Sequence, residues 1–182
     1  RENIKTMNFL DTFLKDYERE DYEDILEIAE AISANHEDVI THLQSALDNP
    51  KEYFQKNAHR FHERNIDLEN GELEDEIDLD DLFFLAMVDE LHDYGYLYEV
   101  DWKCRLDDFL WSLEQLKHYA MISHILPDLD LDKNFNVDMW IETINDALEG
   151  NAYICYVDID SDSFPLIIAS PETYRLIGEN DS

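Results

Sequence analysis

The aspartates around residue 130 are the first side chains whose spacing could bind a metal ion. Asp128, Asp130 and Asp132 alternate along the chain, as the first carboxylates of an EF-hand calcium loop do. That loop also needs Gly at its sixth position and a bidentate Glu at its twelfth, where this chain has Lys133 and Met139. The pattern is incomplete, and no calcium site is predicted here.

A second run of alternating aspartates, Asp158, Asp160 and Asp162, lies near the C-terminus. Ser163 and Ala169 occupy the positions that the calcium loop reserves for Gly and Glu, so this run fails the same test. We interpret these carboxylates as part of an acidic surface rather than as a metal site.

The histidines and the nucleophilic side chains also lack the patterns that catalysis requires. His59 and His62 are three residues apart and could share a helix face, but the chain has no His-Glu-x-x-His zinc motif. It has no Gly-x-Ser-x-Gly elbow and no glycine-rich phosphate loop, and neither Cys104 nor Cys155 lies in a nucleophile motif. We therefore expect no catalytic residue, no metal and no cofactor, and a protein that is not an enzyme.

The strongest pattern in the sequence is acidic. Between Asp67 and Asp81, nine of 15 residues are Asp or Glu and none is basic. Because such a segment cannot neutralise itself, we expect it to be exposed and to bind a positively charged partner, flanked by aromatic residues of 94–102 or by the acidic loop 158–162. The predicted partner-binding residues are Glu69, Glu72, Glu74, Asp75, Glu76, Asp78, Asp80, Asp81, Tyr94, Tyr96, Trp102, Asp158, Asp160 and Asp162.

The whole chain has a formal net charge of −32, from 45 acidic and 13 basic residues. Proteins bind a nucleic-acid backbone through Lys and Arg, and anionic membranes attract the same residues, so direct binding to either is excluded. Solubility alone needs a net charge of only about 2–8 in a small domain, and a larger surplus destabilises the fold by self-repulsion. The sequence therefore predicts a strongly basic protein as the partner.

The cysteines and the hydrophobic runs indicate a cellular compartment. Two cysteines that lie 51 residues apart do not form a disulfide framework in a chain with 45% hydrophobic residues, which points to a reducing environment. No apolar run approaches the roughly 20 residues of a membrane span. We expect a cytoplasmic protein that does not bind membranes.

In size, acidity and helix-rich class, the chain resembles the immunity proteins of bacterial toxin–immunity pairs. The resemblance is one of character, and no motif carries it. It implies an inhibitor that occludes the active cleft of a cognate toxin, and a basic cleft of that kind is typical of toxins that act on nucleic acid. A fainter likeness covers Tyr96–Leu116, where Leu97–Lys103 and the following helix with Trp111 are similar to an uncharacterised bacterial domain family.

Two other functions remain open on the sequence. A DNA-mimic regulator of nucleic-acid enzymes would need carboxylates at phosphate-like spacing along an elongated surface. An enzyme or metal-binding domain without a known motif would need a concave pocket with converging carboxylates or histidines. Capture of one basic partner would favour an immunity protein, several nucleic-acid enzymes would favour mimicry, and no partner would favour the remaining class.

The elements that must position these residues are mainly helices. Hydrophobic residues recur at helical intervals through the first 150 residues, with few Gly or Pro to interrupt them. The expected helices cover residues 7–17, 21–35 after a cap at Asp21, 39–47, 50–61 with Pro50 in the first turn, 79–91 after Asp78, 106–120, and 137–148 before Gly150.

The last 30 residues change class. Residues 152–157 and 165–169 are short apolar strands joined by 158–163, which predicts a hairpin, and Ser170 and Pro171 indicate the cap and first turn of a last helix. Residues 96–100 are a candidate further strand. The predicted fold is a single α+β domain over residues 1–182, mostly α: about seven or eight helices packed with a small antiparallel sheet, helical in 1–150, and a hairpin and last helix in 151–182.

Overall fold

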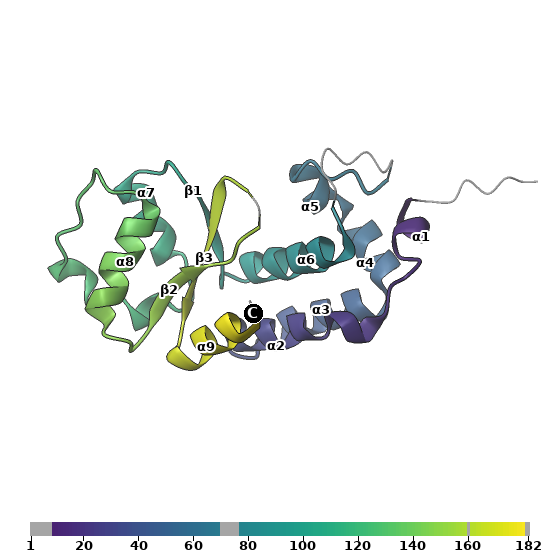
Figure 1. The fold of residues 1–182 in the computed structure, drawn as a ribbon, viewed down its shortest axis with the longest axis horizontal. Helices are drawn as coiled ribbons and strands as arrows, with labels where there is room; N and C mark the ends of the chain where they lie inside the picture. The colour runs from purple at the N-terminus through teal and green to yellow at the C-terminus, as the bar shows by residue number, and fades with distance from the viewer. Residues whose placement is uncertain (1–8, 70–76, 160, 181–182) are drawn as a thin grey trace, which may run out of the picture.

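A computed structural model describes the chain at residues 9–69, 77–159 and 161–180. The predicted class is confirmed, because the described residues form nine α-helices and a small three-stranded antiparallel sheet (Figure 1). The elements are α1 (Phe9–Phe13), α2 (Asp24–Ser33), α3 (Glu37–Asp48), α4 (Pro50–Lys56), α5 (Ala58–Glu63), α6 (Leu79–Asp93), β1 (Tyr98–Asp101), α7 (Leu106–Glu114), α8 (Val137–Leu148), β2 (Tyr153–Tyr156), β3 (Ser163–Ala169) and α9 (Pro171–Asn180).

The sheet has the order β1-β3-β2, so the last strand in the sequence is the central one. The predicted hairpin is the β2–β3 pair, in which Ile154 lies opposite Ile168. The candidate strand near 96–100 is β1, which begins two residues later than expected and pairs Tyr98 with Leu166. A strand from the middle of the chain is thus joined to a hairpin at its end.

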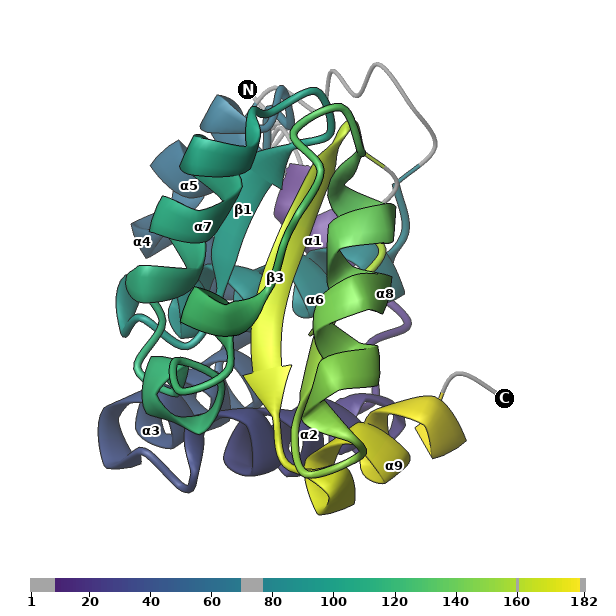
Figure 2. The same ribbon diagram turned by 90° about the vertical axis from the view of Figure 1, so that its left-hand side faces the viewer.

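Alternate side chains of β3 enter two separate hydrophobic clusters. Ile167 packs with the N-terminal helices, whereas Leu166 and Ile168 pack with residues of α7 and α8. Figure 1 shows the sheet between these two groups of helices, and Figure 2 shows β3 between α7, which contacts β1, and α8, which contacts β2. The sheet is therefore covered by helices on both faces. Because successive side chains of a strand point to opposite faces of the sheet, β3 supplies apolar side chains to both clusters.

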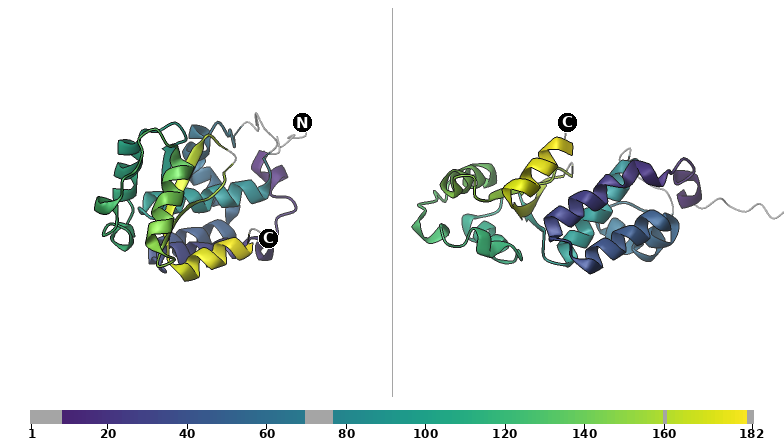
Figure 3. Two further views of the ribbon diagram at one scale, coloured as in Figure 1. Left: turned by 60° about the vertical axis from the view of Figure 1, so that its left-hand side comes forward. Right: turned by 90° about the horizontal axis from the view of Figure 1, so that it is seen from below.

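The C-terminal helix returns to the start of the chain. Figure 3 shows α9 alongside α2, and the hydroxyl of Thr173 donates a 3.3 Å hydrogen bond to the carbonyl oxygen of Ala31. Its predicted start is confirmed, since Pro171 is the first helical residue and Ser170 Oγ accepts from the Thr173 amide at 3.1 Å.

Several predicted helix boundaries are wrong. The first helix ends at Phe13 rather than at residue 17. A short 3₁₀ helix at Arg19–Tyr22 precedes α2, so Asp21 does not cap it. The expected helix 50–61 divides at Asn57, whose side-chain amide donates to the Tyr53 carbonyl at 2.9 Å and competes with the helical backbone. Helix α7 ends at Glu114 rather than 120, and the Lys117 amide then donates to Gly95.

The start of α6 is important for the site described below. Asp78 accepts from the Asp81 amide at 2.9 Å, and the Asp81 side chain accepts from the Asp78 amide at 3.0 Å. This reciprocal capping box confirms the predicted beginning of the helix and fixes both carboxylates at its amino end, where the helix dipole favours negative charge.

Candidate functional site

Two of the acidic segments singled out in the sequence meet in one hollow. Asp81 from α6 and Asp158 from the loop after β2 both line a cavity of about 690 Å³, which we call the acidic groove. Its lining residues are Glu63, Arg64, Asn65, Ile66, Ile77, Asp81, Phe84, Leu85, Glu99, Asp158, Ile159 and Ser161. The groove is thus built from α5, α6, β1 and the β2–β3 loop.

The groove has an apolar floor and a charged rim. Ile66 is buried, and Ile77, Phe84, Leu85 and Ile159 are half-buried. The carboxylates of Glu63, Asp81 and Asp158 belong to exposed residues. This combination suits Lys or Arg side chains, which lay their aliphatic stems on apolar surface and keep the charged group at the edge.

Arg64 is the one cation among the residues that line the acidic groove, and it is already paired. One of its terminal nitrogens lies 2.7 Å from Asp89 Oδ1 and 2.5 Å from Glu99 Oε1. Glu99 is fixed further by the Ser163 hydroxyl, which donates to it at 3.1 Å. Because its charge is balanced by two carboxylates, Arg64 leaves the groove negative and ties α5 and α6 to β1.

The second oxygen of Asp89 is buried, and no described residue donates a hydrogen bond to it. Burial raises the pKa of Asp89 above its ordinary value, although the paired Arg64 acts to lower it. Asp89 does not line the groove, but it carries a partly compensated carboxylate next to Arg64, which does.

A buried carboxylate, Glu90, organises the helices behind the groove. Its Oε1 accepts from the Tyr53 hydroxyl at 2.7 Å and from Arg60 at 2.8 Å, and its Oε2 lies 2.8 Å from His42 Nδ1. Burial raises the pKa of Glu90, but the hydrogen bonds from Tyr53, His42 and Arg60 outweigh it and leave the pKa below its ordinary value. Arg60 also pairs with Asp93. This network joins α3, α4 and α5 to α6.

The other acidic residues that were predicted to bind a partner fall into two groups. Glu69, Asp78, Asp80 and Asp162 are exposed but do not line the groove. Glu72, Glu74, Asp75, Glu76 and Asp160 fall outside the residues that the structure describes.

The three predicted aromatic residues are not brought together, and one is not a surface residue. Tyr96 is 8% exposed and packs against His36 and His118, because it precedes β1 and belongs to the cluster of the N-terminal helices. Tyr94 is half-buried, whereas Trp102 is 47% exposed at the other end of β1. The expectation that Tyr96 contacts a partner is therefore corrected.

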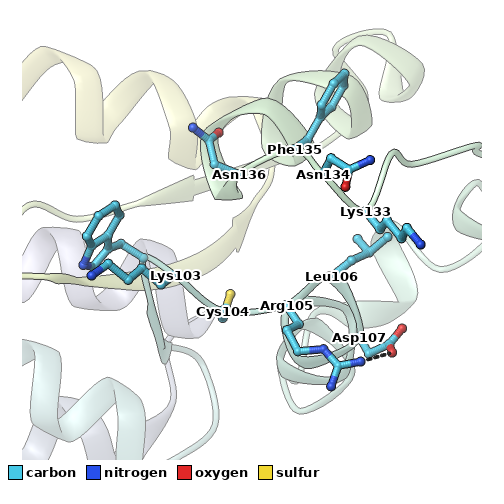
Figure 4. A pocket seen from close by; sticks show the side chains of 10 residues that line it. Lys103, Cys104, Arg105, Leu106, Asp107, Lys133, Asn134, Phe135 and Asn136 are labelled. Atoms are coloured by element: carbon cyan, nitrogen blue, oxygen red, sulfur yellow. Dashed lines mark ion pairs between the residues drawn. The ribbon is translucent and has the colours of Figure 1, made fainter.

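The structure also reveals a hollow that sequence reasoning missed. A cavity of about 560 Å³, which we call the basic hollow, lies between residues 102–107 and 133–136 (Figure 4). Three of the 13 basic residues line it, namely Lys103, Arg105 and Lys133. The sequence did not predict this grouping, because Lys133 is far from the other two residues along the chain and no motif includes all three.

The remaining chemistry-bearing groups form no reactive centre among the described residues. Both cysteines are free, and burial raises the pKa of their thiols, that of Cys155 to about 12, so both are protonated at neutral pH. No group of three or more His, Cys, Asp or Glu side chains in the described part of the chain could hold a metal ion. That the protein has no cofactor stays a prediction.

Hydropathy adds one finding. Within residues 9–69, 77–159 and 161–180, no helix combines the length and the apolar character needed to cross a membrane.

Comparison with known proteins identifies a family. No curated protein and no solved structure matches the chain. The model of one family, described as Domain of unknown function (DUF6630), matches residues 24–178, which include the acidic groove, the basic hollow and all three strands. The chain therefore belongs to the DUF6630 family.

Proposed function

We propose that this protein is an acidic inhibitor that binds and neutralises a basic protein, as immunity proteins do with their toxins. The observation that carries the proposal is the acidic groove, where residues nearly 80 positions apart, Asp81 and Asp158, line one hollow with an apolar floor. A basic segment of the partner docks in this groove, and the charge of the rest of the molecule attracts it.

The net charge of −32 supports attraction over a distance. Complementary potentials raise association rate constants to about 10⁸–10⁹ M⁻¹s⁻¹ at low salt, compared with about 10⁵–10⁶ for neutral partners. Such speed is useful to an inhibitor that must capture a toxin before it acts. The same charge makes an enzyme for anionic substrates a poor alternative.

The composition of the groove supports binding at short range. A guanidinium or ammonium group that reaches Glu63 or Asp81 exchanges water for charge-assisted hydrogen bonds, while its aliphatic stem covers Phe84 or Ile77. Removal of one member of a desolvated pair at an interface costs about 2–5 kcal/mol. A few such pairs are enough to make this groove the main contact.

The pairing of Arg64 supports a pre-formed site. Because Arg64 holds Asp89 and Glu99, the wall of the groove is fixed before a ligand arrives, and the partner does not pay for its ordering. A partner whose basic surface normally holds nucleic acid fits best, since the rim carboxylates take the place of phosphates.

A pair of matched triple variants tests the proposal. The groove variant combines Glu63→Gln, Asp81→Asn and Asp158→Asn, and the control combines Glu27→Gln, Glu114→Gln and Glu142→Gln on exposed positions of α2, α7 and α8. Each removes three negative charges, so a difference between them reports position rather than net charge.

The measurement uses the partner captured by cross-linking in the source cells. We expect a single basic protein whose association with the groove variant is slower by about tenfold or more and less dependent on salt, with a much smaller change for the control. Equal slowing of both variants would contradict docking in the groove. Capture of several nucleic-acid enzymes would instead support a DNA mimic. The absence of a basic partner would refute both functions.

A further inference from the structure

The two edges of the sheet are not equivalent. At the β2 edge, the side chain of Asn145 on α8 accepts from the Ile154 amide at 2.7 Å and donates to the Ile154 carbonyl oxygen at 2.8 Å. Both backbone groups of Ile154 that point away from β3 are therefore bonded within the molecule. No further strand can pair with them, and this edge is closed.

The backbone of β1 alternates between bonds to β3 and the opposite side. The Trp102 amide donates to the carbonyl oxygen of Asp162 at 3.1 Å, which extends the β1–β3 register by one step. Residues 98, 100 and 102 therefore exchange hydrogen bonds with β3, and the N–H and C=O groups of Glu99 point away from it. Among the residues that the structure describes, no hydrogen bond reaches this outward pair. The β1 edge is open at Glu99.

The open edge is short and lies between two helices. Figures 1 and 2 show β1 between α7 and α5. Helix α7 contacts β1, and Arg64, which follows α5, binds the Glu99 side chain. The Cys104 amide donates to the Asp101 carbonyl oxygen at 2.9 Å, so a turn closes the edge where β1 ends. A short edge of this kind limits uncontrolled pairing and still offers hydrogen bonds to one extended segment.

The face of β1 that carries the Glu99 side chain is acidic. A cavity of about 350 Å³ lies there, and it is lined by Arg60, Glu63, Arg64, Asp89, His92, Asp93 and Glu99. Four of these residues are acids, and both arginines are already paired with carboxylates of the same cavity. A strand added to β1 would direct every second side chain to this face. The cavity therefore favours a Lys or Arg at those positions.

The opposite face of β1 is aromatic. The ring of Tyr98 on β1 meets the ring of Trp111 on α7 edge to face, with 5.6 Å between their centres. Trp111 is 53% exposed, so much of its ring is open to contact. Pairs of aromatic and β-branched side chains stabilise neighbouring strands. This face therefore favours uncharged, β-branched residues at the alternate positions of an added strand.

We propose that β1 accepts an extended segment of a basic partner as a fourth, antiparallel strand, in which basic and β-branched residues alternate. A basic residue opposite Glu99 exchanges both backbone hydrogen bonds with it and places its side chain toward the acidic cavity. The residues on either side of it lie on the face of Tyr98. The inference rests on the proposed function for the basic character of the partner and adds the way in which it is held.

A second copy of this chain is a poor occupant of the edge. Glu99 and Asp101 are two residues apart in β1, so their side chains point to the same face. In a two-fold pairing of two β1 strands, these carboxylates would lie opposite carboxylates, which destabilises the pair. Each copy also carries a net charge of −32. Charge complementarity therefore selects a basic segment.

Three synthetic peptides of about seven residues test the inference on the whole chain. Lys and Thr alternate in each, and two of them carry N-methyl groups on the amides of either the lysines or the threonines, so their charge is the same. In an antiparallel strand the lysines lie opposite Glu99 and turn their amides to β1, whereas the threonine amides point away. We expect methylation of the lysine amides to weaken binding about tenfold or more, and methylation of the threonine amides to change it less than about twofold.

Amide hydrogen exchange, followed by NMR, locates the added strand. We expect the unmodified peptide at saturation to slow exchange at Glu99 about tenfold or more and to leave Ile154 unchanged, because its N–H already donates to Asn145. Equal binding of all three peptides, equal loss with both methylated ones, or a loss confined to the threonine set would each overturn the inference. Slower exchange at Glu99 on concentrating the protein alone would assign the edge to a second copy and would also overturn it.

Two substitutions at one position separate the backbone from the side chain. Glu99→Gln removes the carboxylate and keeps the outward N–H, whereas Glu99→Pro removes both, and proline is tolerated where the N–H of an edge strand points outward. Arg64 loses the same partner in both variants. We expect Glu99→Pro to bind the unmodified peptide about fivefold or more weakly than Glu99→Gln, and equal binding would contradict strand addition.

The peptide experiment and the capture of a partner fail independently. Without strand pairing of the peptide, the acidic inhibitor keeps the groove as its contact, and only the inference at β1 is lost. Without a basic partner in the source cells, the proposed function is refuted, although pairing of the peptide with β1 would still be measured.

Discussion

The hydroxyl of Tyr53 donates a 2.7 Å hydrogen bond to Oε1 of Glu90, a carboxylate that is 2% exposed. Because Arg60 and His42 contact the same carboxylate, Glu90→Gln leaves buried polar groups without their charged partner. We expect a loss of about 3–5 kcal/mol in the free energy of unfolding, and about 1.5–3 kcal/mol for Tyr53→Phe. Urea denaturation measures both, with the exposed Glu114→Gln as a control that changes stability by less than about 0.5 kcal/mol.

The stabilisation by Glu90 should depend on pH. Its pKa lies below the ordinary value of 4.5, so its ionised form stabilises the fold above that value, and this contribution is lost as the pH falls through the folded-state pKa. The difference in unfolding free energy between the natural chain and Glu90→Gln is therefore expected to be constant near neutral pH and to shrink below about pH 4.5. Denaturant titrations at several pH values measure it; a difference that grew on acidification would show that Glu90 is not ionised in the folded protein.

Salt should stabilise the whole protein. With a net charge of −32, repulsion between exposed carboxylates opposes folding, and 0.1 M salt screens such interactions beyond about 10 Å. We expect a higher melting temperature at moderate than at low ionic strength. An unchanged melting temperature would mean that the carboxylates are already paired or are too far apart to repel each other.

The end of α2 offers a stabilising substitution. Ala34 has a φ of 51°, in the left-handed region that a side chain with Cβ disfavours by about 1–2 kcal/mol. Ala34→Gly removes this strain, while glycine loses about 0.5–1 kcal/mol through backbone entropy, so we expect a gain of up to about 1 kcal/mol. Ala31→Gly, inside the same helix, should instead destabilise the protein by about 0.5–1 kcal/mol. Thermal unfolding of both variants compares the two positions.

Local signals in the sequence were sufficient where a helix end is fixed by its own residues. Asp78 and Pro171 marked the beginnings of α6 and α9 because capping and a restricted φ act within one turn. Helix α7 was predicted too long, since its end is decided by a contact from Lys117 to Gly95, which no local pattern reveals. Tyr96 was expected on the surface, but it lies in the core because it packs against the distant residues His36 and His118.

The site was predicted in part. Its charge was evident from the density of acids around Asp81, but the meeting of Asp81 with Asp158 depends on the path of the β2–β3 loop in space. The basic hollow was missed for the same reason, because Arg105 and Lys133 are separated by the whole of α7 and a long connection. The hydrophobic periodicity of a segment does not show which distant segment it will contact.

The central position of β3 sets a limit on how this protein can fold during synthesis. The chain reaches Asp101 at the end of β1 about 60 residues before Ser163, and at ~5–20 residues per second that interval lasts roughly 3–12 s. Throughout it, β1 has no partner strand, and both hydrophobic clusters lack the side chains that β3 supplies. A nascent chain must therefore wait with an open strand edge until β3 is made, and loss of that strand would leave neither hydrophobic cluster complete.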